Sequence, residues 1–439
     1  MNAVVLAVVL MLALSLARFP VVAAIIVAAL AGGLASGMEL STALASFNSG
    51  IGNGASVALS YAVLGAFAAA IATSGLPQFL SQKALAVVGV DDSKQLGGKV
   101  LICFVLLLAA IASQNLIPIH IAFIPLLVPP LLITMAKIGL DRRAVACVLA
   151  GGMITTYMFL PVGFGAIYLN DILLGNLQQA GLDTEGLSVM SAMWMPAMGM
   201  VAGLLIAIFF SYRKKRNYDM TAIEQLEAGH TEVKPVVLLL ALIAIVTTFV
   251  VQLMFDSMVL GALAGFILFT GTGVVKWRES DGLFIDGMKM MATIGFIMIA
   301  AAGFAQVLKD TGDVPALVEQ SAALVGNSKV VGALVMLLVG LVITMGIGSS
   351  FSTVPIIATI YVPIAVALGF SPLAIVALVG TAGALGDAGS PASDSTLGPT
   401  AGLNVDGQHD HIRDTVIPTF IHYNIPLLVF GWLAAITIG

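Results

Sequence analysis

The segment that decides the fold is Gly386-Asp387-Ala388-Gly389-Ser390-Pro391-Ala392-Ser393-Asp394-Ser395-Thr396-Leu397-Gly398-Pro399-Thr400. It lies between two long apolar stretches and holds two carboxylates, five hydroxyls, three glycines and two prolines in fifteen residues. Lipid cannot hydrogen-bond free N–H and C=O groups, so irregular backbone at bilayer depth must be buried in protein or line a cavity. We therefore expect this segment to form part of an ion or solute site within a membrane.

The composition predicts a chain that spans a membrane many times. Of its 439 residues, 59% are hydrophobic and 9% are charged, whereas soluble domains average about 25% charged residues. Apolar runs recur at about 20 residues, the length needed to cross about 30 Å of hydrocarbon. We predict an all-α polytopic protein with about 12–14 transmembrane segments, surrounded by the lipid bilayer. The net charge of −5 argues against a nucleic-acid partner.

One clearly hydrophilic loop, residues 213–234, divides the chain. Four basic residues, from Arg213 to Arg216, open it directly after an apolar segment, so the positive-inside rule places this end in the cytoplasm. We expect a multi-pass protein of the cell's inner (cytoplasmic) membrane. A shorter polar, glycine-rich stretch at 48–54 predicts a surface turn, with a re-entrant segment as the alternative.

Short motifs recur at constant spacing in the two halves. Pro161 and Pro391 lie 230 positions apart, and Pro125 and Pro355 share that offset. An odd number of predicted segments separates the matching positions, which gives the halves opposite orientations. Inverted repeats with paired broken or re-entrant helices are typical of secondary transporters, whose site lies near the bilayer midplane. The predicted units are one membrane domain, 1–439, with a first repeat at 56–180, a cytoplasmic linker at 213–234 and a second repeat at 288–404.

Each half contains two polar breaks in apolar sequence. Hydroxyls, amides and freed carbonyls there can replace the hydration shell of a small cation, and helix N-termini suit a substrate carboxylate. The predicted cation-binding residues are Ser349, Ser350, Ser352, Thr353, Asp387, Ser390, Asp394, Ser395 and Thr396. The predicted substrate-binding residues are Ser113, Gln114, Asn115, His120, Asn170, Asp171 and His422. No metal site other than one for Na⁺ is expected.

These residues also have structural interpretations. Small residues such as Ser113 allow close helix packing, which is the favoured account for that serine alone. Asp394 can cap the next helix. For Asp387 and Asp394 a site is favoured, because intramembrane carboxylates are rare and costly unless they have a function. His120 and His422 can relay protons, bind substrate or pack as neutral hydrogen-bonded residues.

The loop from Asp406 to Asp414 is rich in His and Asp and precedes the last apolar segment. This content hints at a metal, but the spacing matches no strong signature, so a solvated or salt-bridged loop is favoured. Cys103 and Cys147 each lie in apolar sequence and are predicted to be buried small hydrophobes.

Two motifs of the second half are similar to those of a known family, the NhaC-type sodium/proton antiporters. Its Gly-Ser-Ser-aromatic-small-Thr motif resembles Gly348-Ser349-Ser350-Phe351-Ser352-Thr353, and its Gly-Asp…Ser-Pro-Leu-Ser-Asp-Thr-Thr motif resembles the segment that begins at Gly386. The chain is most similar to the YuiF-like branch, whose members are often labelled putative amino-acid (histidine-type) permeases. It departs from the antiporters by Ala392 in place of Leu and Ser395 in place of Thr. The resemblance implies cation-binding roles for Ser349, Ser350, Thr353, Asp387, Ser390, Asp394 and Thr396.

Two functions follow from the motifs and the resemblance. The first is an Na⁺- or H⁺-coupled permease for an amino acid of the histidine type, working by alternating access. The alternative is an Na⁺/H⁺ antiporter that exchanges ions through Asp387 and Asp394. The sequence contains no His-Glu-x-x-His or Gly-x-Ser-x-Gly motif, so we expect no enzyme and no cofactor beyond the coupling ion. The partners are a small solute or ion and lipid, and a homodimer is compatible with this scheme.

Overall fold

The computed structural model describes residues 2–438 apart from 18, 77–78, 80–94, 116–123, 125–126, 163, 222, 224–233, 256, 314–315 and 317–327. Within these residues, helices are the only regular structure, as the composition predicts. Six stretches of the described chain are long and apolar enough to cross a membrane: Gly54–Ile71, Gly97–Gln114, Val189–Ser211, Pro235–Phe255, Lys329–Ile347 and His411–Thr437. Several shorter apolar helices accompany them. The total of about 12–14 segments stays a prediction.

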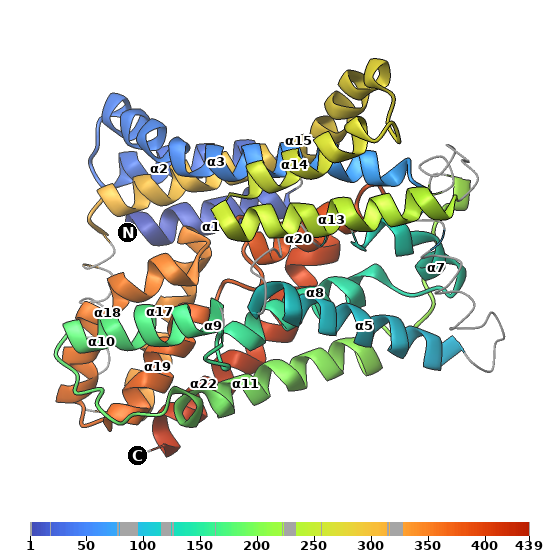
Figure 1. The fold of residues 1–439 in the computed structure, drawn as a ribbon. Coiled ribbons are helices and arrows are strands. Elements are labelled where there is room, and N and C mark those ends of the chain that lie inside the picture. Colours follow the sequence, from blue (N-terminus) through green and yellow to red (C-terminus); the bar gives the residue numbers. More distant parts are fainter. Residues whose placement is uncertain are drawn as a thin grey trace.

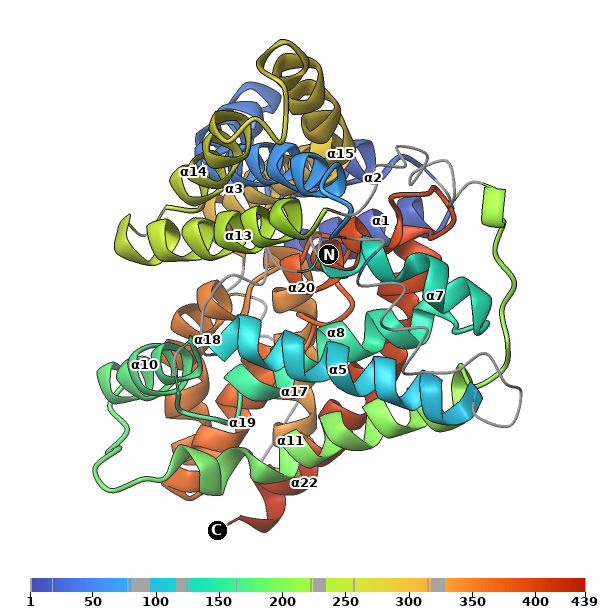
Figure 2. The ribbon, with the colours of Figure 1, turned by 45° about the vertical axis from the view of Figure 1, so that its right-hand side comes forward.

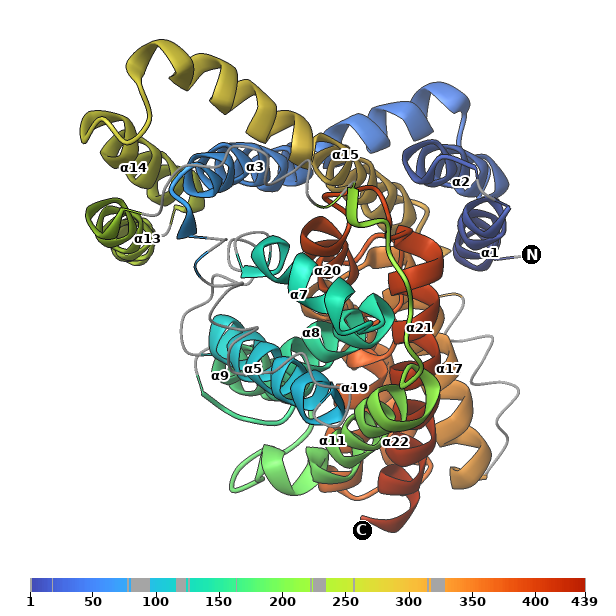
Figure 3. The same ribbon diagram turned by 90° about the vertical axis from the view of Figure 1, so that its right-hand side faces the viewer.

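Six helices from the two halves form one layer of the molecule, at the top of Figures 1 and 3. They are α1 (Ala3–Leu16), α2 (Val21–Ala35), α3 (Leu40–Ala72), α13 (Pro235–Phe255), α14 (Met258–Gly271) and α15 (Trp277–Asp310). The long helices α3 and α15 pack along each other, with α2 against α15 and α14 against α3. Each half therefore places its shorter helix against the long helix of the other half.

Close packing of α3 on α15 corrects one prediction. The stretch 48–54 is not a turn, because α3 runs through it without a break. A Cβ on Gly50 would lie 2.6 Å from the Ala302 carbonyl oxygen, and one on Gly65 would lie 2.3 Å from that of Gly287. These glycines thus let two backbones approach closely, as small residues do between membrane helices.

The remaining helices form the body below this layer, which Figure 2 shows from a second side. In the first half they are α5 (Gln95–Asn115), η2 (Pro129–Leu131), α7 (Leu132–Lys137), α8 (Arg142–Tyr157), α9 (Phe164–Ala166), η3 (Ile167–Leu174), α10 (Gly175–Gln179), α11 (Val189–Ile206) and η4 (Ala207–Ser211). In the second half they are α17 (Lys329–Ile347), α18 (Ser350–Ala367), α19 (Pro372–Ala384), α20 (Asp394–Leu403), η5 (His411–Val416), α21 (Ile417–Thr419), η6 (Phe420–Asn424) and α22 (Ile425–Thr437).

The order of helices recurs between the two halves. In the body, α5 packs on α8 in the first half and α17 on α19 in the second, while α11 packs on α22. The two repeats stay a prediction, and positions 56 and 288, at which they are predicted to begin, fall inside α3 and α15. The opposite orientation of the two repeats in the bilayer stays a prediction.

The helices α8 and α19 form the centre of the body. Both are almost entirely buried, as are the free thiols of Cys103 and Cys147, which confirms the prediction for the two cysteines. Each central helix stops at a polar break, α8 at Tyr157 and α19 at Ala384. The fold therefore brings the ends of two buried helices to the same region, where the candidate site lies.

Candidate functional site

The break between α19 and α20 is centred on Asp387, which is 5% exposed. The hydroxyl of Ser393 donates to its Oδ1 at 2.5 Å. The hydroxyls of Tyr157 and Ser350 donate to its Oδ2 at 2.5 and 3.2 Å, so the carboxylate joins α8, α18 and its own segment. A buried carboxylate is costly unless hydrogen bonds compensate it, and here the hydroxyls of these three residues and of Ser395, at 3.3 Å from Oδ1, do so.

Side chains satisfy the irregular backbone around this carboxylate. Gly386 and Gly389 have φ values of +89° and +119°, which favour glycine. Asn424 of the last helical region accepts from the N–H of Gly386 at 2.7 Å, and its amide donates to the Ala388 carbonyl. His411 contacts the Pro391 carbonyl through Nε2 at 3.0 Å. Side chains thus satisfy backbone groups of the break, as buried non-helical backbone in a membrane protein requires.

The hydroxyls of two predicted cation ligands in this segment donate to backbone carbonyl groups. The Ser390 hydroxyl donates to the Met345 carbonyl at 3.0 Å, and the Thr396 hydroxyl donates to the Ser390 carbonyl at 2.6 Å. Ser395 contacts the carboxylate itself, because its hydroxyl lies 3.3 Å from Asp387 Oδ1 as well as 2.9 Å from the backbone oxygen of Asp387.

The second break separates α17 from α18. Gly348 ends α17 with a φ of +72°, and α18 begins at Ser350. Within α18 the Thr353 hydroxyl donates to the Ser349 carbonyl at 2.9 Å. Thr353 therefore supports the break. Among the described side chains of this motif, Ser349, Ser350 and Phe351 line the cavity described next.

A cavity of about 270 Å³ lies where the two breaks meet. One part of its wall is polar and the other is apolar or aromatic, and its lining residues are Gln114, Met153, Ile154, Tyr157, Phe164, Ser349, Ser350, Phe351, Asp387, Asp394 and Ser395. The rings of Phe164 and Phe351 lie 4.5 Å apart between centroids. The amide oxygen of Gln114 is buried without a hydrogen-bond partner among the described residues.

The first half enters the site through Tyr157, which the sequence analysis did not single out. Tyr157 and Asp387 are 230 positions apart, the same offset as Pro161 and Pro391. The repeat spacing was therefore a usable signal, because it assigns Tyr157 to the position that Asp387 holds in the second half. Phe164 could have been found in the same way, because it lies 230 positions before Asp394.

Other predicted substrate-binding residues lie elsewhere. Asn170 and Asp171 are exposed on η3, and the Ser113 hydroxyl donates to the Ala110 carbonyl at 2.9 Å. His422 contacts the Ser211 hydroxyl at 2.8 Å and the Pro418 carbonyl at 2.7 Å, as a packed, hydrogen-bonded histidine. His120 and the side chains of Asn115 and Ser352 lie outside the described residues. Of the predicted substrate set, the structure brings only Gln114 to the cavity among the described side chains.

The oxygens of this site suit a small hard cation. They are two carboxylates and several hydroxyls, and among the described residues no three His, Cys, Asp or Glu side chains gather as a transition-metal site would require. A polytopic helical protein with two discontinuous helices meeting at a buried carboxylate and a small cavity has the organisation of a secondary transporter.

Comparison with known proteins gives the same class and the family. The chain belongs to the Na⁺/H⁺ antiporter family, whose sequence model matches residues 148–432, and a second Na⁺-H⁺ antiporter family model matches residues 2–88. The protein is a multi-pass membrane protein and a secondary transporter.

Three relatives illustrate the similarity. An uncharacterized membrane protein of Vibrio parahaemolyticus is 55% identical over 88% of each chain. The putative amino acid transporter YuiF of Bacillus subtilis is 50% identical, again over 88% of each chain. The Na⁺/H⁺ antiporter NhaC of Alkalihalophilus pseudofirmus is 30% identical over 36% of this chain and 34% of its own. The resemblance to NhaC-type antiporters and to their YuiF-like branch is confirmed.

Proposed function

We propose that the protein is a cation-coupled permease for an amino acid, moving the solute and Na⁺ or H⁺ together by alternating access. The observation that carries this proposal is the composition of the cavity wall. The first residues of α18 and α20 line it together with the carboxylates of Asp387 and Asp394, beside an aromatic surface. Such a wall offers separate partners for a cation, for both charged ends of a zwitterion and for its side chain.

The volume of the cavity supports an organic solute. In the same measure a site for a single water needs roughly 10–15 Å³, and the cavity holds about 270 Å³. Pockets for small organic ligands begin near about 300 Å³. A bare ion leaves most of this space empty, whereas a compact amino acid fills it.

The chemistry of the wall suggests how each group would bind. Helix N-termini carry free N–H groups and the positive end of the helix dipole, so α18 and α20 suit the solute carboxylate. The Gln114 amide oxygen is a buried acceptor without a hydrogen-bond partner among the described residues, and a solute ammonium group is a donor that satisfies it. Phe164 and Phe351 offer ring surface for a flat side chain such as imidazole.

The coupling cation belongs beside Asp387. Its two carboxylate oxygens, the hydroxyls of Ser350 and Ser395 and the nearby Asp394 form a cluster of hard oxygens. A cation there screens the two carboxylates from each other, so cation and solute stabilise the same closed arrangement. Binding one would therefore raise the affinity for the other, which is the thermodynamic requirement for cotransport.

The second candidate is Na⁺/H⁺ exchange without an organic solute. It is favoured by the family and by the small number of intramembrane carboxylates, since Asp387 alone can take either H⁺ or Na⁺. In this scheme the aromatic part of the cavity wall has no direct role. The name of the relative YuiF supports the permease over the exchanger.

Uptake into proteoliposomes tests the two candidates. Labelled histidine and other amino acids are supplied outside, with an inward Na⁺ or H⁺ gradient or with none. The permease accumulates one of these solutes only when a cation gradient is present. Absence of any amino-acid uptake, together with Na⁺-dependent collapse of a pH gradient, contradicts the permease and supports the exchanger. Asp183→Asn, at an exposed loop carboxylate, is the matched control for Asp387→Asn.

We also propose that the basic linker lies in the cytoplasm, which places the protein in the inner membrane. The run Arg213 to Arg216 directly follows the span that ends at Ser211, as the positive-inside rule expects of a cytoplasmic loop. This orientation is tested by thiol labelling of a cysteine introduced at Lys214, which an impermeant reagent should label in inverted vesicles and not in whole cells. Labelling in whole cells by an impermeant reagent contradicts it.

A further inference from the structure

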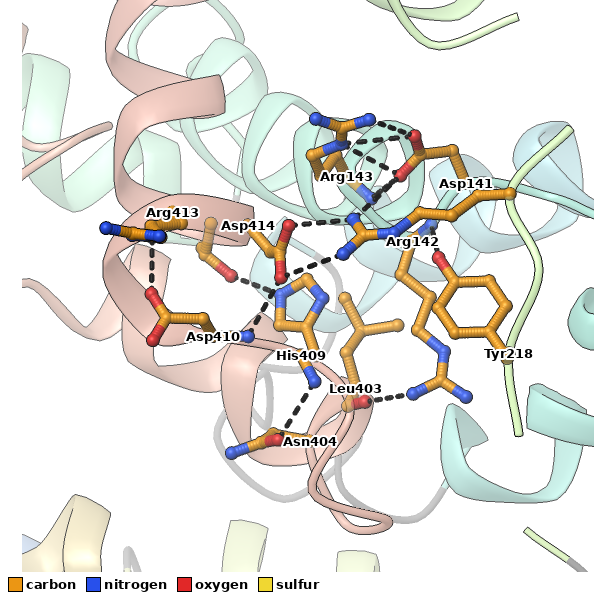
Figure 4. Close-up of polar contacts among 12 residues, drawn as sticks. Asp141, Arg142, Arg143, Tyr218, Leu403, Asn404, His409, Asp410, Arg413 and Asp414 are labelled. Carbon is orange, nitrogen blue, oxygen red and sulfur yellow. Dashed lines mark hydrogen bonds and ion pairs between the residues drawn. The ribbon is translucent and has the colours of Figure 1, made fainter. Parts of the chain in front are cut away.

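Two histidines just before and at the start of η5, His409 and His411, are hydrogen-bonded within the protein. His409 is 2% exposed and lies in the segment between α20 and η5, and His411 begins η5. The prediction of a solvated or salt-bridged loop is confirmed, because Asp406 and Asp414 pair with Arg142 and Arg216, while Asp410 and Arg413 are exposed. Figure 4 shows His409 beside Asp414 and Arg142.

The two imidazole rings are joined by two threonine hydroxyls. Nε2 of His409 lies 2.7 Å from the Thr415 hydroxyl, which accepts from the Thr400 hydroxyl at 2.9 Å. The Thr400 hydroxyl lies 2.8 Å from Nδ1 of His411, whose Nε2 contacts the Pro391 carbonyl at 3.0 Å. Both threonines are buried, so bulk water does not replace any link.

Each member of this chain can both give and take a proton. A hydroxyl has one donor and two acceptor positions, and an imidazole changes which nitrogen carries its proton. With both hydroxyls pointing from His411 toward His409, Thr415 donates to His409 Nε2. With both reversed, His409 Nε2 donates to Thr415 and Thr400 donates to His411 Nδ1. The two orientations differ by the direction of every donor and leave all heavy atoms in place.

The far end of the chain faces a charged cluster and has an open acceptor or donor position. Nδ1 of His409 is buried without a hydrogen-bond partner among the described residues. Three charged groups face His409: Asp414 of η5, Arg142 of α8 and Arg216 of the linker. The charge of Asp410 interacts with His411. Burial lowers the pKa of His409, which favours the neutral ring.

We propose that His409, Thr415, Thr400 and His411 form a proton relay from the linker side of the protein to the break that holds Asp387. A proton arrives at His409 Nδ1, and the Nε2 proton moves to Thr415. The Thr415 proton moves to Thr400, and the Thr400 proton moves to His411 Nδ1. Each hydroxyl gains one O–H bond and loses one, and the net change is a proton added at His411.

The relay ends on the segment that carries the candidate cation site. His411 holds the carbonyl of Pro391, which lies between Asp387 and Asp394 in the same irregular segment. A positive charge on His411 disfavours a cation beside these carboxylates, and a bound cation disfavours the proton. This inference deepens the proposed function, since it names the route by which H⁺ would be linked to cation binding.

The first test compares Thr415→Val, which removes the hydroxyl and keeps the shape, with Thr415→Ser, which keeps the hydroxyl. In ¹⁵N-histidine NMR of the purified full-length protein, exchange of the His411 ring protons with water is expected to slow about tenfold or more in the valine variant alone. Thr400→Val against Thr400→Ser repeats the test at the second hydroxyl. Equal exchange rates in the valine and serine variants overturn the relay, whether or not the protein transports anything.

The second test uses vesicles that contain a pH dye and receive an Na⁺ pulse. Thr415→Val is expected to slow Na⁺-driven proton movement about tenfold, with ²²Na⁺/Na⁺ exchange within about twofold of wild type. Loss of both fluxes in equal measure indicates a structural role and overturns the relay. If the wild-type protein moves neither Na⁺, protons nor amino acids, the proposed function is contradicted instead. The NMR comparison then still shows whether the proton relay exists.

Discussion

The two breaks share one backbone plan and differ in chemistry. Tyr157 ends α8, and Asp387, 230 positions later, follows the end of α19. The two residues meet, since the phenol of one donates to the carboxylate of the other at 2.5 Å. The first half contributes a neutral phenol donor and the ring of Phe164, and the second half contributes both carboxylates and the ring of Phe351. On the proposed function, the aromatic part of this wall faces the solute and the carboxylates face the cation.

The starts of the same two helices differ in a second way. Asp141 caps α8 and Ser371 caps α19, each by accepting a backbone N–H of the first turn. After the cap, α8 continues with two arginines, where α19 has proline and leucine. Ion pairs of these two arginines therefore reinforce the start of α8, where Arg216 of the linker also pairs with Asp141.

Replacing Asp387 with asparagine is expected to have the largest effect on transport. Asparagine keeps the size and one acceptor of the side chain, and it removes the charge that a coupling cation needs. Transport should fall by roughly 100-fold or more, as for removal of a central electrostatic group, with expression and the melting temperature little changed. Asp183→Asn should transport like wild type. A wild-type rate in Asp387→Asn excludes this carboxylate from the site.

Breaking the Arg142–Asp406 pair is expected to give the largest loss of stability. Both side chains are fully buried, with 2.6 Å between Nη2 and Oδ2, and Arg142 also donates to the Leu403 carbonyl. Arg142→Met leaves a buried carboxylate without its partner, which costs about 3–5 kcal/mol. The melting temperature in detergent measures this loss. The double variant Arg142→Met/Asp406→Leu should recover much of it, and a double variant no better than the single one would show that packing dominates.

The same pair predicts how stability depends on pH. Burial alone raises the pKa of Asp406, but the hydrogen bonds and charge of Arg142 outweigh it, so the net pKa is lowered. A carboxyl whose folded pKa is lowered contributes stability that is complete above its unfolded pKa of about 3.9 and is lost as pH falls through the folded value. The wild-type melting temperature should therefore drop below about pH 4 more than that of the double variant.

Tyr157→Phe separates the role of the Tyr157 hydroxyl from that of the aromatic wall of the cavity. The change removes the hydroxyl that donates to Asp387 Oδ2 and leaves the ring against Phe164 and Tyr168. A lost hydrogen bond to a charged group is worth about 1.5–3 kcal/mol, so cation affinity should weaken by about tenfold or more. Phe351→Leu is the companion that keeps the hydroxyl and reduces the aromatic surface. Equal changes of solute affinity in the two variants would contradict separate roles for the Tyr157 hydroxyl and the aromatic wall.

The sequence was enough to predict the class of the molecule and part of the candidate site. The remaining predictions failed because they depend on packing between segments far apart in the sequence. Hydropathy and the polar composition of the break were enough for the helical class, for Asp387 and Asp394, and for Ser349 and Ser350. Glycines at 48–54 were read as a turn, because local sequence does not reveal that another helix packs on them. Asn170 and Asp171 were placed by their position near a break, but the face of a helix that meets the cavity depends on tertiary packing.

Arg216→Gln tests the ion pairs that Arg216 of the linker forms with Asp414 and Asp141. Its guanidinium lies 2.7 Å from Asp414 and 3.5 Å from Asp141, but its side chain is 32% exposed. Water and salt screen such a pair, so its loss is expected to cost about 1 kcal/mol or less. The change in melting temperature should be small, and it should shrink further when measured in high salt. A loss comparable with that of Arg142→Met would show that the linker, through Arg216, holds this end of the body as firmly as the buried Arg142–Asp406 pair does.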